Sequence, residues 1–277
     1  MRQLSQLVAV SRERDFRSTM WALLYRAVSR AKRLQDPYFV RRAQLGAQVH
    51  HQLGGTIASG PFQGVRLALP SWWSQSDIGG MLLGLYEAEL SGLISGLPAS
   101  HQTLINIGAG DGYYPVGFAR LFPESRVYCF EISAAGRKGI GYNAALNNAA
   151  SRIEILEEAT PNSVLGLSSD YGVDLSKCLV LVDIEGGEYD LLTDEILLAL
   201  RGSYLLVEIH RTAANNDSAF EGLVQRCAYW NCREVRKGSR DPGNLEATKG
   251  LSDDDLWALC SEGRAYQMTW LYCEPRE

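Results

Sequence analysis

The sequence predicts an α/β protein with a doubly wound, mainly parallel seven-stranded sheet and a helical extension at its N-terminus. Three observations support this fold class. Strand-like apolar runs alternate with helical stretches from residue 103 to residue 273. The run CLVLV at 178–182 is apolar at every position, which is typical of a parallel strand covered on both faces. The first strand is followed by a glycine-rich loop, GAGDG at 108–112, and then by a helix.

The N-terminal fifth of the chain is a basic appendage on an acidic body. Residues 1–50 hold ten Lys and Arg against three Asp and Glu, whereas the whole chain has a formal net charge of −5. Apolar residues at three- and four-residue steps predict an amphipathic, basic helix over 16–34. We expect its apolar stripe to pack within the chain or in a homo-oligomer. Alternatively, Arg26, Arg30 and Arg33 hold the chain in peripheral contact with an anionic membrane surface.

A second helix is predicted from Pro37 to the pair Gly54-Gly55, which ends it. Residues 55–69 predict a short hairpin, and a further helix follows Ser76, which is placed as its N-cap. We expect residues 1–60 to form the basic helical extension and residues 61–277 the main domain.

Seven strands are predicted in the main domain, with helices between most of them. They cover residues 103–107, 126–130, 152–156, 178–183, 204–210, about 232–235, and 268–273. The segment 236–265 is rich in glycine and charged residues and is predicted to be the most mobile loop.

The composition is that of an ordinary globular protein, with 46% hydrophobic and 21% charged residues. The chain has no run of 18 apolar residues and its start lacks the apolar core of a secretory signal. Its six cysteines form no C-x-x-C pair, and several lie in apolar strand-like runs, which favours a reducing compartment. We therefore expect a cytoplasmic protein. The acidic body disfavours nucleic acid as a partner.

The loop after the first strand contains Gly108, Gly110 and Gly112. A tight turn without a ligand is one explanation, because such motifs are weak on their own. However, Glu131 follows the second strand, where a carboxylate can accept hydrogen bonds from both hydroxyls of a ribose. Tyr113 stands where a dinucleotide-binding loop would have its third glycine, so a ligand with a ribose but no pyrophosphate fits better.

The segments INIGAGDGYY, VYCFEIS, LVDIEGGEYDLL and LLVEIH resemble S-adenosylmethionine-dependent methyltransferases of the Rossmann-like class, specifically the FkbM-like family. The resemblance covers roughly residues 80–277. Its most diagnostic part is DIEGGE at 183–188 followed by VEIH at 207–210. It implies a Rossmann-like methyltransferase domain that binds S-adenosylmethionine.

The resemblance also implies which residues hold the cofactor. Gly108, Ala109 and Gly110 approach its methionine and ribose, Glu131 binds the ribose diol, and Ile132 lies against the adenine. Asn106 replaces an acidic residue that is common before the loop. The full implied set is Asn106, Gly108, Ala109, Gly110, Tyr113, Glu131, Ile132, Glu158, Ala159 and Asp183.

Acidic residues follow the fourth and fifth strands, at the edge of an open sheet where ligands bind. They are Asp183, Glu185, Glu188 and Glu208, and His210 lies beside them in sequence. Glu185 as a helix cap, Glu188 as a solvated helix residue and His210 as a structural residue are the alternatives. The catalytic candidates are Asp183, Glu208 and His210, which are also candidate ligands for Mg²⁺ or Mn²⁺.

The resemblance implies an O-methyltransferase whose acceptor is a small molecule or a glycan, because FkbM-like relatives often methylate a hydroxyl of a sugar or a glycosylated intermediate. Two other classes remain open. One is a cofactor-binding scaffold or membrane-associated module without methyl transfer. The other is a nicotinamide-dependent oxidoreductase, which Tyr113 and the lack of a Tyr-x-x-x-Lys pair disfavour.

Overall fold

The computed structural model describes residues 36–73, 75–211, 217–242, 245–264 and 268–276. The basic helix predicted over 16–34 lies outside these residues, so it stays a prediction, as does the domain boundary at residue 60. The next helix, α2 (Pro37–Leu53), has the predicted bounds. Asp36 caps its start by accepting a hydrogen bond from the backbone N–H of Tyr38, and Gly54 ends it in a left-handed conformation.

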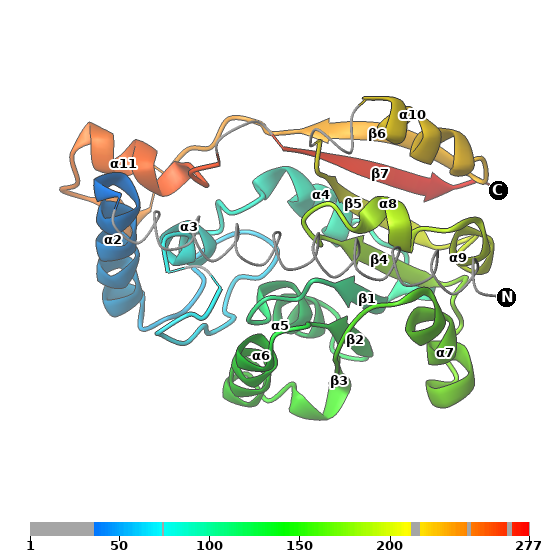
Figure 1. The fold of residues 1–277 in the computed structure, drawn as a ribbon. Helices are drawn as coiled ribbons and strands as arrows, with labels where there is room; N and C mark the ends of the chain where they lie inside the picture. The colour runs from blue at the N-terminus through cyan, green and yellow to red at the C-terminus, as the bar shows by residue number, and fades with distance from the viewer. Residues whose placement is uncertain (1–35, 74, 212–216, 243–244, 265–267, 277) are drawn as a thin grey trace, which may run out of the picture.

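Seven strands form one sheet in the described part of the chain (Figure 1). Their order is β3-β2-β1-β4-β5-β7-β6, and β7 is antiparallel to both of its neighbours while the other pairs are parallel. The strands are β1 (Thr103–Ile107), β2 (Val127–Phe130), β3 (Ile153–Leu156), β4 (Cys178–Val182), β5 (Tyr204–Ile209), β6 (Trp230–Arg236) and β7 (Thr269–Pro275). The predicted fold class is therefore confirmed. The change of direction in strand order between β1 and β4 places a binding crevice at the carboxyl ends of these strands.

Helices cover both faces of the sheet and close two apolar cores. One core holds buried side chains of α2, α3, α5, α6 and α11, and the other those of α7, α8, α9 and α10. The helices are α3 (Ile78–Leu83), α4 (Ser91–Ser95), α5 (Tyr113–Leu121), α6 (Ala134–Leu146), α7 (Pro161–Tyr171), α8 (Glu188–Leu191), α9 (Asp194–Ala199), α10 (Asp217–Arg226) and α11 (Asp253–Cys260). Double coverage explains the uninterrupted apolar run of β4.

The helix predicted after Ser76 is wrong in its start and its length. α3 begins at Ile78 with Asp77 as its N-cap residue, and it ends after one and a half turns at Gly84. Gly84 has a positive φ of 71°, and a Cβ there would overlap the backbone of Ser59. The chain therefore turns here, and two short helical pieces, a 3₁₀ turn at Ala88–Leu90 and α4, follow instead of a continuous helix.

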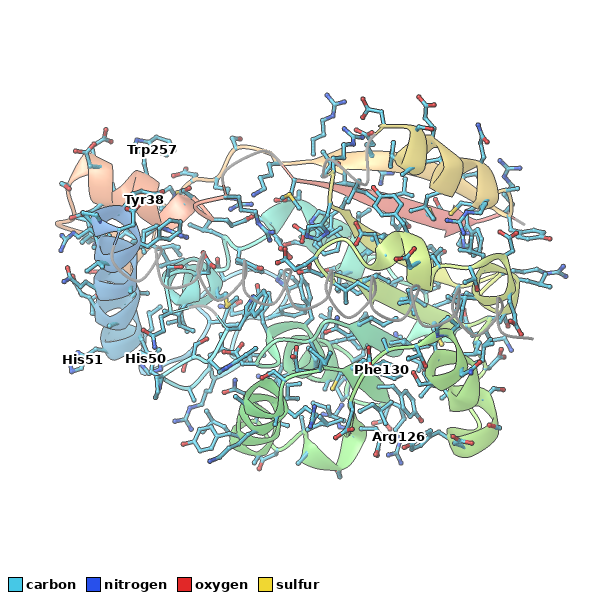
Figure 2. All side chains as sticks on the ribbon, in the orientation of Figure 1. Tyr38, His50, His51, Arg126, Phe130 and Trp257 are labelled. Carbon is cyan, nitrogen blue, oxygen red and sulfur yellow. The ribbon has the colours of Figure 1, made fainter. Side chains whose placement is uncertain are left out.

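The short hairpin expected at 55–69 is present. Thr56 and Arg66 form an antiparallel bridge, and backbone hydrogen bonds join Ile57 to Val65 and Leu67 to Gly55. The expectation for 236–265 needs correction. The segment expected to be a mobile loop contains α11, whose N-cap Ser252 accepts a hydrogen bond from the N–H of Asp255. α11 packs against α2 and α3. Figure 2 shows Trp257 of α11 close to the start of α2, with His50 and His51 at the other end of that helix.

Within the described residues, no helix combines the length and the apolar composition needed to cross a bilayer.

Candidate active site

The three glycines of the loop after β1 are required by the packing of the protein itself. All have positive φ, and a Cβ on Gly108 would overlap the carbonyl oxygen of Asp183 at the end of β4. A Cβ on Gly110 would lie 3.3 Å from the ring of Trp73, and one on Gly112 would lie 3.2 Å from Cα of Ile140. A tight, crowded turn thus accounts for these glycines without a ligand.

Glu131 is held at the end of β2 by the backbone of two loops. Its Oε2 accepts a hydrogen bond from the N–H of Gly110 at 2.8 Å, and its Oε1 accepts one from the N–H of Ser133 at 2.8 Å. Burial raises the pKa of this carboxyl, and the two hydrogen bonds counteract that effect. Because each carboxylate oxygen has a second lone pair, the side chain can still accept hydrogen bonds from a ligand.

Gly136 in α6 packs against the same carboxylate. A Cβ at this position would lie 2.7 Å from Cγ of Glu131 and 2.7 Å from the carbonyl oxygen of Gly110. Sequence reasoning missed this residue, because a helical glycine carries no local sign of what its helix packs against. Gly136 thus keeps Glu131 and the glycine loop in contact.

Other residues of the predicted cofactor set differ in how far they are buried. Asn106 is fully buried, and its Oδ1 has no hydrogen-bond partner among the described residues. Ile132 is 70% exposed although it is apolar. Glu158 is exposed and Ala159 half-buried, in the segment after β3. Asn106 and Ile132 thus offer a buried acceptor and an uncovered apolar surface.

Tyr113, the next residue of the predicted cofactor set, has a buried side chain. It is buried in an aromatic cluster, where its ring contacts those of Phe62, Tyr86 and Tyr114 edge to face. It is the first residue of α5 and belongs to the apolar core. Its place in the predicted cofactor set stays a prediction.

The pairing of β4 with β5 brings the catalytic candidates to one face of the sheet. Val182 pairs with Val207, so the next residues, Asp183 and Glu208, come side by side. Because side chains alternate along a strand, His210 extends on the same face as Glu208. The register of β4 with β5 and the two-residue alternation of side chains along a strand are enough to explain this arrangement.

His210 lies at the centre of four carboxylates. Its Nε2 is 3.4 Å from Oε2 of Glu208, 3.6 Å from Oε2 of Glu185 and 3.8 Å from Oδ1 of Asp183, while its Nδ1 is 3.4 Å from Oε1 of Glu188. The imidazole and the side chains of Glu188 and Glu208 are buried. Both ring nitrogens, Oδ1 of Asp183 and Oε2 of Glu208 have no hydrogen-bond partner among the described residues. Buried polar atoms of this kind are usually satisfied, so their convergence indicates a site for a ligand.

The alternatives for Glu188 and Glu185 are both wrong. Glu188 is 0% exposed, and its carboxylate accepts hydrogen bonds from the backbone N–H groups of Gly186 and His210, each at 2.9 Å. Glu185 has a positive φ of 56° and caps no helix, because Gly187 is the N-cap residue of α8. Glu188 therefore ties the ends of β4 and β5 together, and Glu185 projects its carboxylate toward His210.

The carboxylates set the protonation of His210. Burial lowers the pKa of the imidazole, but the adjacent Glu188 carboxylate and the charges of Asp183 and Glu185 outweigh burial and raise the pKa above its usual value. A raised pKa makes the imidazole a stronger base than an ordinary histidine.

Arg264, from the segment before β7, closes the site on the other side. Its guanidinium contacts Glu208 at 3.0 Å, Glu87 at 3.1 Å and Glu262 at 3.2 Å. Burial and the nearby charge of Asp183 raise the pKa of Glu208 well above its usual value. Burial likewise raises the pKa of Glu87 to about 8. Arg264 and Glu87 were missed in the sequence analysis, because both residues are far in sequence from the ends of β4 and β5.

The geometry changes the predicted metal ligands. Among the described residues, Asp183, Glu185 and His210 each offer a ligand atom, and these atoms lie within 4.8 Å of one another. Glu208, which was expected as a ligand together with Asp183 and His210, is not in this group, and one of its oxygens pairs with Arg264. The three-residue set supplies two carboxylate oxygens and one imidazole nitrogen.

A cavity of about 530 Å³ has Arg264 in its lining. It lies between the segment after β6 and the end of α11. Its lining includes Lys237, Arg240, Trp257, Glu262 and Arg264. Arg264 also contacts Glu208, so this one side chain links the lining of the cavity to the group of acids around His210.

No protein-family model and no curated protein sequence matches the chain. Several solved structures are similar to it. The cofactor-bound Rv0187 from MTB is 14% identical, and the match covers 87% of this chain and 91% of that chain with a TM-score of 0.46. The C-terminal domain of precorrin-6Y C5,15-methyltransferase from Rhodobacter capsulatus is 16% identical over 68% of this chain and 86% of that chain, with a TM-score of 0.44. Precorrin-6Y C5,15-methyltransferase from Geobacter metallireducens GS-15 is 15% identical over 76% of this chain and 94% of that chain, with a TM-score of 0.43. At these identities and TM-scores, the likenesses carry no argument about the reaction of this chain.

Proposed function

We propose that the chain is an S-adenosylmethionine-dependent methyltransferase that methylates a hydroxyl oxygen, with a sugar or a glycosylated intermediate as acceptor. The observation that carries the proposal is the convergence of His210 with Asp183 and Glu208 at the carboxyl ends of β4 and β5, beside the glycine loop. In a doubly wound sheet, this edge is where ligands bind. The segments DIEGGE at 183–188 and VEIH at 207–210, which resemble S-adenosylmethionine-dependent methyltransferases, support the same reaction.

The residues around the loop suit this cofactor. The buried Oδ1 of Asn106 would accept a hydrogen bond from its ammonium group, Glu131 would accept hydrogen bonds from the ribose, and the exposed Ile132 would cover the adenine. When bound, S-adenosylmethionine supplies an electrophilic methyl group on a sulfonium. The protein must then orient the acceptor oxygen and remove its proton.

His210 is the residue that removes the proton. Glu188, beside Nδ1, favours the tautomer that carries its proton on Nδ1 and leaves the Nε2 lone pair free. Nε2 faces Asp183 and Glu208. A protonated Glu208 can donate a hydrogen bond to the acceptor oxygen, and the Asp183 carboxylate, 3.8 Å from Nε2, can stabilise the imidazolium that forms when His210 takes the proton.

A second mechanism uses a divalent ion, and the convergence of Asp183, Glu185 and His210 favours it. Mg²⁺ or Mn²⁺ would be held by these side chains and would lower the pKa of the acceptor hydroxyl. In that case His210 is a ligand and not a base. The ion-dependent mechanism predicts that a chelator abolishes activity, whereas the general-base mechanism predicts full activity in a chelator.

The cavity beside Arg264 is the proposed entry for the acceptor. Trp257 offers an aromatic face, and Lys237 and Arg264 offer hydrogen-bond donors. A small molecule or glycan with several hydroxyl groups matches such a lining better than an apolar molecule does.

Cofactor binding is tested by calorimetry with S-adenosylmethionine and S-adenosylhomocysteine. Glu131→Ala is expected to weaken both by about 1.5–3 kcal/mol, because hydrogen bonds to a charged group are lost. Glu157→Ala is the matched control, since Glu157 is exposed nearby and pairs with Arg137. NAD is expected not to compete. An unchanged affinity in Glu131→Ala would remove Glu131 from the site.

Methyl transfer is tested with methyl-labelled cofactor and a panel of glycans and glycolipids, followed by mass spectrometry for the addition of one methyl group. His210→Gln is expected to lower the rate by about 10²–10⁴-fold if the imidazole is the base. His51→Gln is the control, because His51 is exposed at the far end of α2 (Figure 2). Cofactor binding without transfer to any acceptor would support a scaffold instead.

A chelator separates the two mechanisms. Full activity in chelator together with loss of activity in His210→Gln supports the general base. If chelator abolishes turnover, Mg²⁺ or Mn²⁺ restores it, and Asp183→Asn is inactive but binds the cofactor normally, the ion-dependent mechanism holds.

A further inference from the structure

Three of the six cysteines meet at the antiparallel end of the sheet, away from the acids around His210. Cys227 follows α10, Cys232 lies in β6 and Cys273 lies in β7. Their sulfur atoms lie within 4.8 Å of one another. The proposed methyl transfer makes no use of this thiol cluster.

Cys232 and Cys273 are placed to form a bond. They are direct partners in the register of β6 and β7, so their side chains leave the same face of the sheet. Their sulfur atoms are 2.8 Å apart. Directly opposed residues in an antiparallel pair have Cα atoms about 4.5–5.5 Å apart, which lies within the range that disulfides span. No backbone rearrangement is needed to join the two sulfurs.

Cys232 is the more reactive member of the pair. It is half-buried, whereas Cys227 and Cys273 are buried. Contacts with the sulfurs of Cys227 and Cys273 and the charge of Arg276 lower the pKa of Cys232. The thiolate is the form of cysteine that peroxides oxidise, and Cys232 is the least buried of the three cysteines.

A bound metal ion explains the geometry less well. Tetrahedral zinc has Zn–S distances of about 2.3 Å, which separate two sulfur ligands by about 3.8 Å. The contact between Cys232 and Cys273 is much shorter than this. The group also offers three side-chain ligands among the described residues, one fewer than a closed structural zinc site has.

We infer that Cys232 and Cys273 form a peroxide-sensitive modification site that converts reversibly to a disulfide. The Cys232 thiolate attacks one oxygen of hydrogen peroxide, so the O–O bond breaks and a sulfenic acid forms with release of hydroxide. The sulfur of Cys273 then attacks the sulfenic sulfur, the S–O bond breaks, and the thiol proton leaves with the hydroxyl as water. The two sulfurs together lose two electrons, which reduce one molecule of hydrogen peroxide.

The bond would connect the edge strand β6 to its neighbour β7, which in turn pairs with β5. It closes a loop between positions 41 residues apart, and this loop contains α11 and Arg264. A disulfide lowers the conformational entropy of the unfolded chain, so we expect the oxidised protein to melt at a higher temperature than the reduced protein.

The test uses the reduced full chain, treated with hydrogen peroxide in the presence of a chelator. Wild type is expected to lose two of its six free thiols, and peptide mapping is expected to find Cys232 joined to Cys273. A thiol reductant should restore all six. Cys129→Ser is the matched control, because Cys129 is buried outside the thiol cluster; this variant should still lose two thiols.

Cys232→Ser is expected to keep its five thiols under the same treatment. Because the peptide mapping is done on wild type, it tests the inference even if a variant folds poorly. Six free thiols after peroxide, a disulfide between other cysteines, or oxidation of Cys232 to a sulfinic acid without loss of Cys273 would overturn it. So would a stoichiometric metal ion that protects the thiols until it is removed.

Discussion

Glu131 and Gly136 show how single residues shape the cofactor loop. The carboxylate of Glu131 accepts N–H groups from the loop after β1 and from the start of α6, so it connects two segments before any ligand is present. Gly136 leaves the space that this carboxylate occupies. A residue that the sequence suggests for ligand binding thus also has a structural role.

At the residue scale, Gly136→Ala is expected to destabilise the protein by about 1–3 kcal/mol, because the new Cβ overlaps Glu131 and the carbonyl of Gly110. It should also weaken binding of S-adenosylhomocysteine. Gly141→Ala in the same helix is the control. The nearest atom to its Cβ would be 3.8 Å away, so the better helix propensity of alanine should stabilise the protein by up to about 1 kcal/mol.

Denaturant unfolding and calorimetry measure both effects. Equal stability and equal affinity in the two variants would show that the packing of Gly136 against Glu131 has no energetic consequence.

At the scale of elements, the docking of α11 on α2 depends on a buried arginine. Nε of Arg42 donates a hydrogen bond to the carbonyl of Ala258 at 3.0 Å, and its Nη2 pairs with Asp77 at 2.6 Å. The same guanidinium also donates to the carbonyl of Ser261. A buried arginine with these partners holds two helices and the start of α3 together.

Arg42→Ala is expected to lower the free energy of unfolding by about 3 kcal/mol, because the partners of a buried charge are left unsatisfied. Arg41→Ala is the matched control. Arg41 also contacts α11, through Asp255, but its side chain is half exposed and water screens the pair, so its loss should change stability much less than the loss of Arg42 does. Chemical denaturation would reveal the difference, and similar losses in both variants would contradict the role given to Arg42.

At the scale of the whole molecule, buried carboxyls predict how stability depends on pH. Burial is the main cause of the raised pKa of Glu87, and the nearby Glu262 adds to it, while Arg264 opposes it. In the unfolded chain this carboxyl ionises near its ordinary value of 4.5, whereas in the folded protein it keeps its proton up to about pH 8. The contribution of Glu87 to stability is therefore fully present below pH 4.5 and is lost as the pH rises toward 8.

The difference in stability between wild type and Glu87→Gln should shift across this window by up to about 1.4 kcal/mol per pH unit, with wild type losing stability toward alkaline pH. Glu124→Gln, at an exposed position, is the control and should follow wild type. Thermal or denaturant unfolding at a series of pH values measures this. Parallel curves for wild type and Glu87→Gln would mean that Glu87 ionises alike in both states.

Much of the sheet could be predicted because its signals are local. An apolar run such as the one in β4 identifies a doubly covered strand, and Gly54 identifies a helix end, without knowledge of distant residues. The positions of Asp183, Glu208 and His210 also follow from sequence, since the ends of adjacent strands meet at one edge. Where local signals were ambiguous, as in the glycine-rich stretch after Ser76, the prediction of one continuous helix was wrong.

The sequence by itself determined the fold class, the bounds of most strands and the grouping of acids beside the glycine loop, because strand period and strand order need only local pattern and general topology. The tertiary structure alone decided that the carbonyl of Asp183 crowds Gly108, that Glu188 is buried, and that Arg264 reaches Glu208. These facts depend on atoms from segments far apart in the chain. Burial and the resulting pKa shifts arise from such contacts, and no short stretch of sequence contains them.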